Sequence, residues 1–210
     1  MTFRNTFPKI GSAIEKTMLN KITLHKPLVS NLSGSFKFYF HNAPRYWIRA
    51  MTFPPYFWNE RDGEQISTHV KSLVSSGNLI AGTTTSILNS SLFYWWFILL
   101  SNSRDLSLRE IESFPVGIEN MPTSIKEALS ATCQHLMDDL KENAFRKTCY
   151  YKATGKVIYD EYYPSCSKPI IDEIDRVLAK HYGFTDEELD FIINYDIKYR
   201  MGQDAEGEED

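Results

Sequence analysis

The sequence predicts an α+β fold: a mixed α/β domain with a twisted sheet, followed by a helical region that contains one long helix. Two observations lead to this prediction. Runs rich in aromatic and β-branched residues, which are typical of strands, fall mainly before residue 80. Apolar residues spaced three or four positions apart, which are typical of amphipathic helices, dominate the chain beyond residue 120.

The first domain begins with a helix over residues 10–22, because four apolar residues at four-residue steps share one helical face. Strands follow, and the turn-like residues 42–44 favour a hairpin between the first two. Pro54 and Pro55 end the second strand. A polar loop over residues 59–63 leads to the third. The predicted strands are Phe36–His41, Arg45–Phe53 and Gln65–Leu73.

Residues 80–100 predict two helices that are broken at Asn89-Ser90-Ser91, since Asn and Ser favour helix caps. The second helix carries the longest apolar run, Leu92–Leu100, which is too short to span a bilayer because a spanning helix needs roughly 20 residues. A polar loop over residues 102–105 and a short helix between Ser107 and Pro115 complete a domain that we place at residues 1–118.

Residues 119–201 predict a helical scaffold region. Its long helix is expected to start at a capping box formed by Ser124 and Glu127, and its apolar face reaches Ala144. A loop around Gly155 and an extended piece over residues 157–162 follow.

Two more helices are then expected. One covers Pro169–His181 and ends at Gly183, and the other opens at a second capping box, Thr185 with Glu188. Residues 202–210 are acidic and predict a disordered tail.

The net charge of −4 conceals an uneven distribution of charge. Residues 1–110 hold 12 basic and 6 acidic side chains, residues 111–200 hold 11 and 16, and the last ten residues hold 5 acids and no base. A basic half favours a polyanionic partner. Three cysteines without CxxC spacing and an N-terminus without an apolar signal segment predict reduced thiols in a cytoplasmic protein, with no membrane partner.

The residues that catalysis or metal binding would need do not form a recognisable set. The sequence contains no GxG nucleotide cradle and no GxSxG nucleophile elbow. Its five histidines lack metal-ligand spacing. The acidic clusters 172–175 and 186–188 fit the first turns of two predicted helices, where acids complement the helix dipole. We therefore expect no catalysis, no metal and no cofactor in this chain itself.

Basic and amide side chains of the first domain predict a binding surface for nucleic acid. In the second predicted strand Arg45, Trp47 and Arg49 would share one face, a pattern suited to phosphate or guanine with aromatic support. Asn102 and Arg104 in a polar loop are residue types that read adenine and guanine. The alternative is that these are ordinary surface cations. The candidate DNA-binding residues are Lys37, Arg45, Arg49, Arg61, Lys71, Asn102 and Arg104.

Several segments together resemble a known family. Ser86–Tyr94 (SILNSSLFY), Ser101–Leu106 (SNSRDL) and Phe114-Pro115 resemble the "ILNSxLF…SNGRDL…FP" run of target recognition domains in N6-adenine-specific DNA methyltransferases of type IIG and related restriction–modification systems. The stretches Phe7–Gly11 and Tyr182–Gly202 look like the entry and the terminal segment of the same region. Ser103 stands where the pattern has glycine.

The resemblance implies an α+β target recognition domain that reads bases of double-stranded DNA opposite an N-terminal methylase domain. That domain would use S-adenosylmethionine to methylate a flipped adenine. Phe53-Pro54-Pro55-Tyr56 resembles the methylase catalytic tetrapeptide, but Phe53 cannot accept the required hydrogen bond. We therefore expect this chain to be a fragment whose parent is an adenine-specific methyltransferase, with or without a fused endonuclease.

A function of another class stays open: a protein-interaction scaffold of a restriction–modification complex, without base reading. On that interpretation the apolar helix at Leu92–Leu100 or the long helix from Thr123 docks a partner. If DNA is read, the long helix is instead expected to pack against the methylase domain.

Overall fold

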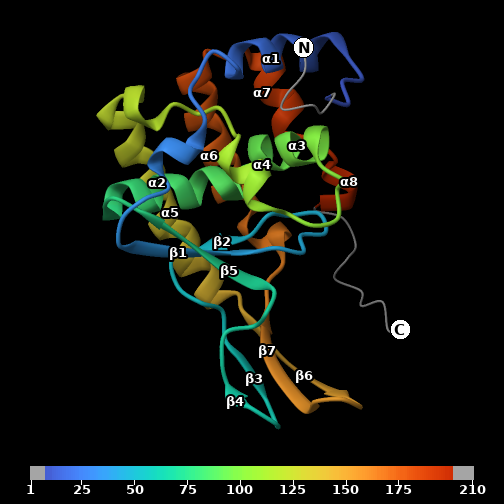
Figure 1. The fold of residues 1–210 in the computed structure, drawn as a ribbon. Coiled ribbons are helices and arrows are strands. Elements are labelled where there is room, and N and C mark those ends of the chain that lie inside the picture. The colour runs from blue at the N-terminus through green and yellow to red at the C-terminus, as the bar shows by residue number, and fades with distance from the viewer. Residues whose placement is uncertain (1–7, 201–210) are drawn as a thin grey trace.

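The computed structural model describes residues 8–200, and their fold is α+β, as expected. Helices form a body, and two small antiparallel sheets lie along one side of it (Figure 1). The helices are α1 (Ala13–Ile22), α2 (Asn78–Asn89), α3 (Ser91–Leu100), α4 (Leu108–Glu112), α5 (Thr123–Glu142), α6 (Pro164–Tyr182), α7 (Asp186–Ile193) and α8 (Ile197–Arg200), with 3-10 turns η1 (Leu28–Asn31) and η2 (Ile118–Asn120). The predicted acidic tail lies outside the described residues.

The first sheet has the strand order β2-β1-β5 and is antiparallel throughout, so the first two strands are antiparallel neighbours as expected, but residues 42–49, and not a turn at 42–44, connect them. Phe38 and Phe40 are buried on the face of this sheet that packs against the helices, while alternate residues of β1 face outward. The strands are β1 (Phe36–His41), β2 (Ala50–Met51) and β5 (Val70–Ser75). The third strand therefore begins five residues later than expected.

The predicted strand over residues 45–53 is wrong for most of its length. Only Ala50–Met51 pair with β1, and residues 45–49 form bends and irregular backbone. Trp47 and Ile48 are both buried within this irregular segment. Arg45 and Arg49 therefore do not share a strand face.

The second sheet, with strand order β4-β3-β7-β6, projects from the helical body as an arm (Figure 1). Phe57 pairs with Tyr159 and Asn59 with Val157, so the sheet joins strands from both predicted regions. The two regions predicted on either side of residue 118 therefore share one sheet. The strands are β3 (Phe57–Asn59), β4 (Gly63–Glu64), β6 (Phe145–Tyr151) and β7 (Gly155–Glu161).

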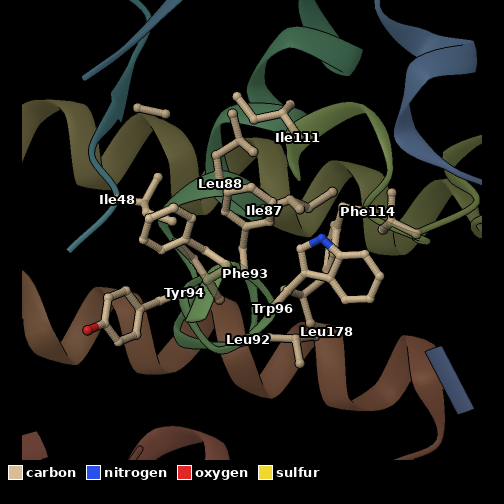
Figure 2. Packing of buried hydrophobic residues seen from close by; sticks show 14 of the residues in the cluster. Ile48, Ile87, Leu88, Leu92, Phe93, Tyr94, Trp96, Ile111, Phe114 and Leu178 are labelled. Atoms are coloured by element: carbon tan, nitrogen blue, oxygen red, sulfur yellow. The ribbon is translucent and has the colours of Figure 1, made fainter. Parts of the chain in front are cut away.

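The helices α2 and α3 form the centre of the molecule. The predicted break between them is confirmed: Ser90 caps α3, and its Oγ accepts a hydrogen bond from the Phe93 backbone N–H at 3.0 Å. Trp95 and Trp96 are fully buried, and Figure 2 shows Trp96 packed beside Phe114. Within residues 8–200 no helix is long and apolar enough to cross a membrane.

Small side chains let α2 lie directly against α5. The hydroxyls of Thr83 and Ser86 donate hydrogen bonds to backbone carbonyls of α5, at 3.1 and 2.7 Å. A Cβ on Gly82 would come within 2.5 Å of the Ser130 hydroxyl. This close approach explains why a helix rich in Thr and Ser lies in the core.

Two expectations for the helical region are corrected and two are confirmed. The long helix begins at Thr123 with Pro122 as its N-cap and no side-chain cap, so the first capping box is wrong. Helix α6 starts at Pro164, which places Asp175 deep inside the helix instead of in its first turn. Gly183 ends α6 with φ +64°, and the Thr185 capping box is present with both of its hydrogen bonds.

Candidate nucleic-acid interface

Three loops meet at one end of the β2-β1-β5 sheet, and we refer to residues 42–49, 65–69 and 101–106 as the loop end. The Asn42 backbone N–H donates to the His69 carbonyl at 2.9 Å, and the Leu106 N–H donates to the Asn42 carbonyl at 2.9 Å. These bonds hold loops together that are far apart in the sequence. The loop end lies on the side of the sheet nearest α8 (Figure 1).

Helix α8 fixes one of these loops. The Arg200 Nε–H donates to the Tyr46 carbonyl at 3.2 Å, and the Tyr199 ring stacks on the Tyr46 ring with centroids 6.0 Å apart. Both tyrosines are exposed, whereas Arg200 is buried. Arg200 thus fixes the backbone of the loop at residues 42–49 from its buried side, while the side chains of Arg45 and Tyr46 are exposed to solvent.

Arg45 and Arg104 are brought together at the loop end, each in one of its loops. Arg45 is exposed and has no carboxylate within 4 Å among the described residues. The Arg104 side chain is 85% exposed, and its nearest partner is the adjacent Asp105 at 3.6 Å. Such a surface pair contributes little energy, so the guanidinium is available to another anion.

The remaining predicted cations are spread over two sheets. Lys71 follows the loop end on β5, and its ammonium donates to the Thr68 carbonyl at 2.7 Å. Lys37 lies toward the other end of β1, opposite Val74. Arg61 lies in the β3–β4 turn of the arm, where it is paired with Asp62 at 2.9 Å. The structure therefore separates Lys37 and Arg61 from the loop end.

Arg49 lies in the loop end but differs from the exposed arginines. It is half-buried, and its guanidinium carbon lies 4.6 Å from the centroid of the Tyr162 ring. Burial lowers the pKa of Arg49 to about 10, which still leaves the side chain charged at neutral pH.

Asn102 shapes its loop. Its Oδ1 accepts hydrogen bonds from the backbone N–H groups of Arg104 and Asp105, at 3.0 and 3.3 Å. Bidentate recognition of adenine needs a free amide oxygen beside the amide N–H. Because both lone pairs of Oδ1 are engaged, we expect Asn102 to set the conformation of Arg104 and not to read a base.

Ser103 has φ +62°, in the left-handed region that favours glycine. We expect Ser103→Gly to raise the free energy of unfolding by roughly 0.5–1 kcal/mol, because the strain on the serine backbone exceeds the entropy that glycine loses on folding. Urea unfolding measures this change. As the reverse test, Gly183→Ala should lower the free energy of unfolding by about 1 kcal/mol, because Gly183 has φ +64°. A Cβ at Gly183 would meet nothing within 4 Å, so backbone strain alone causes this loss. A destabilised Ser103→Gly variant would contradict this account of the loop.

The segments that carry the family resemblance divide into core and surface. Ser86–Tyr94 is buried throughout, and Phe114 is fully buried, so these segments form the core. Ser101–Leu106 instead contributes a loop of the loop end. The resemblance therefore includes both a structural centre and one exposed loop.

No family model, no curated protein and no solved structure matches this chain. Within residues 8–200, no three His, Cys, Asp or Glu side chains are grouped so that they could hold a metal ion.

Proposed function

We propose that this chain is a sequence-reading module for double-stranded DNA, and that it belongs to an N6-adenine-specific DNA methyltransferase of a type IIG-like restriction–modification system. The methylase domain with its S-adenosylmethionine would lie outside this chain. Two findings support the proposal. Several segments of the sequence resemble those of such target recognition domains and occur in the same order along the chain. In addition, arginines without strong acidic partners lie together at the loop end.

The scarcity of acids in the loop end carries the argument for DNA. The three loops of the loop end contain three arginines and a single acid, Asp105. Of the eleven Lys and Arg side chains at residues 111–200, five form ion pairs: Lys141–Asp138, Arg146–Asp160, Lys147–Glu161, Lys168–Asp172 and Arg176–Glu173. Arginines without a strong acidic partner supply the bidentate donors that guanine and phosphate accept, and each neutralised phosphate releases counterions.

Arg104→Ala is expected to weaken binding of the recognised duplex by about 1–3 kcal/mol and to relax base preference at one position, if Arg104 contacts a base. If it contacts phosphate, the loss is uniform over sequences and the slope of log affinity against log salt falls by about one. Fluorescence anisotropy with a set of duplexes distinguishes the two results.

Lys16→Ala provides the matched control. Lys16 is exposed on α1, which covers the side of the body opposite the sheets (Figure 1), so its loss should leave DNA affinity unchanged. Equal affinity and equal selectivity of Arg104→Ala and the unaltered chain would refute the role of Arg104.

A second candidate function is a protein-interaction scaffold. The version in which the Leu92–Leu100 helix docks a partner is overturned, because nearly every side chain of α3 is buried. The apolar face of α5 is likewise buried, so contact with a methylase domain would use its polar face. The arm favours a partner surface more directly, because Phe145, Tyr150 and Tyr151 on β6 are 54%, 76% and 55% exposed. A scaffold would bind its protein partner equally well with and without DNA.

A further inference from the structure

The outward face of the β2-β1-β5 sheet holds a concentration of nitrogen-bearing side chains, and among the described residues none of them has a carboxylate within 4 Å. His41 is the last residue of β1, and its backbone N–H donates to the Arg49 carbonyl at 3.0 Å. The register of β1 and β2 pairs Phe40 with Ala50, which brings the neighbouring residues His41 and Arg49 next to one another. Both border a small, half-enclosed gap together with Tyr39, Phe40, Met51, Pro55 and Val70.

His69 approaches the same place from the loop before β5. Its ring centroid lies 5.8 Å from that of His41, with the two planes inclined by 33°. The other titratable groups around the pair are Arg49 on the β2 side and, beyond it, Tyr162 and Glu161 at the end of β7. Glu161 is engaged by Lys147 and by the Tyr163 hydroxyl; its charge favours the charged form of Arg49, but neither of its carboxylate oxygens lies within 4 Å of the guanidinium.

Arg49 is half-buried and charged, yet among the described residues it has no hydrogen-bond acceptor and no carboxylate within 4 Å; its nearest contact is the Tyr162 ring. A partly buried cation without an anion in direct contact is costly. Its guanidinium is planar and can donate two parallel hydrogen bonds. This geometry matches the oxygens of a phosphate or a carboxylate group.

We propose that Arg49, His41 and His69 form a phosphate-binding site on the outward face of this sheet. Arg49 binds two phosphate oxygens, with its stem held over Tyr162, and the two imidazoles donate N–H groups from the opposite side. The natural source would be a phosphodiester of the bound duplex, a step that rests on the proposed function. A free phosphate group is the other source of the same chemistry.

The histidines report occupancy. Burial, and then the charges of Arg49 and His69, lower the pKa of His41 to about 4, so its imidazole is neutral at pH 7 without a ligand. A bound phosphate adds negative charge beside the ring and favours the protonated form. The pKa of His41 must then rise when phosphate binds, and affinity must increase as pH falls because the bound state takes up a proton.

The first experiment titrates the histidine ring signals by NMR with inorganic phosphate at several pH values. We expect both the His41 and His69 signals to shift, and the His41 pKa to rise with phosphate. The Arg49→Gln variant should show neither effect. Arg49→Lys, which keeps the charge and the stem over Tyr162, should fold normally and show a reduced effect. Histidine pKa values that do not respond to phosphate in the unaltered chain would overturn the site.

The second experiment measures duplex DNA affinity at two salt concentrations for Arg49→Gln, Arg49→Lys and the surface control Lys16→Gln. Loss of one charge-assisted phosphate contact predicts roughly ten-fold weaker binding for Arg49→Gln and a salt slope smaller by about one. Lys16→Gln should match the unaltered chain.

The two experiments separate the site from the proposed function. Phosphate-dependent histidine shifts without any DNA binding would support the site and contradict the DNA function. DNA binding whose affinity and salt slope are the same in folded Arg49→Lys, Arg49→Gln and the unaltered chain would support the function and overturn the site.

Discussion

Asp175→Ala should lower the free energy of unfolding by about 3–5 kcal/mol, because it removes a buried carboxylate that two backbone N–H groups and a nearby buried arginine depend on. The Asp175 carboxylate is buried and accepts hydrogen bonds from the backbone N–H groups of Ser91 and Leu92, both at 3.1 Å. It thus caps α3 from within α6. Burial raises the pKa of Asp175 to about 6, so the carboxylate is mostly charged at pH 7.

The substitution leaves three groups without their partner. The two N–H groups lie in the first turn of a buried helix, where water cannot replace the carboxylate. Arg200, which is 2% exposed, loses the negative charge that favours its own charged form. Because Arg200 also holds the Tyr46 carbonyl, the loop end should loosen as α3 does.

Urea unfolding at pH 7 measures this effect, with Glu173→Ala as the matched control. Glu173 lies on the same helix, but its side chain is 53% exposed and its pair with Arg176 spans 3.4 Å. Its loss should cost less than about 1 kcal/mol. If Asp175→Ala and Glu173→Ala proved equally stable, the buried cap would not have the importance assigned to it.

Asn89→Ala should cost about 2–4 kcal/mol, because it leaves buried backbone groups without partners. The Asn89 Oδ1 accepts from the Ala50 N–H at 3.2 Å, and its Nδ2 donates to the carbonyls of Ala50 and Thr85, both at 2.8 Å. One side chain therefore joins the end of α2 to β2. Since Arg49 directly precedes Ala50, the substitution should also loosen the segment that carries Arg49.

Amide hydrogen exchange at Ala50, together with urea unfolding, measures both consequences. Asn194→Ala is the control, because Asn194 is exposed and its amide bonds only to Asp190 in its own helix. Normal protection of Ala50 in a fully stable Asn89→Ala variant would show that β2 does not depend on Asn89.

The sequence predicted elements whose signal is local. Apolar spacing placed the helices, and Ser90 and Thr185 marked two helix starts because capping depends on residues three positions apart. Strand β6 was missed because its sequence, FRKTCYY, lies in an arm with little buried surface and therefore lacks a clear apolar face. The irregular backbone at residues 45–49 depends on where Trp47 and Ile48 are buried, which is a tertiary property.

The candidate site was predicted only where residue type alone indicates a role. Arg45 and Arg104 were chosen by residue type, and the structure places them in neighbouring loops. The sequence did not establish that the Asn102 amide oxygen accepts a hydrogen bond from the Arg104 backbone N–H within its own loop. An Asn two residues before the donor is nevertheless typical of a turn closed by this hydrogen bond. It gave no sign of His41 and His69 beside Arg49, since their meeting depends on strand register.

Salt dependence of duplex DNA binding by the unaltered chain tests the central claim most directly. With three to four cations of the loop end and its neighbouring strands on phosphates, affinity should fall roughly 40- to 150-fold between about 50 and 200 mM salt. Fluorescence anisotropy with one long duplex at both concentrations suffices. Absence of binding at the lower concentration, or binding of equal strength at both, would contradict a DNA-reading function.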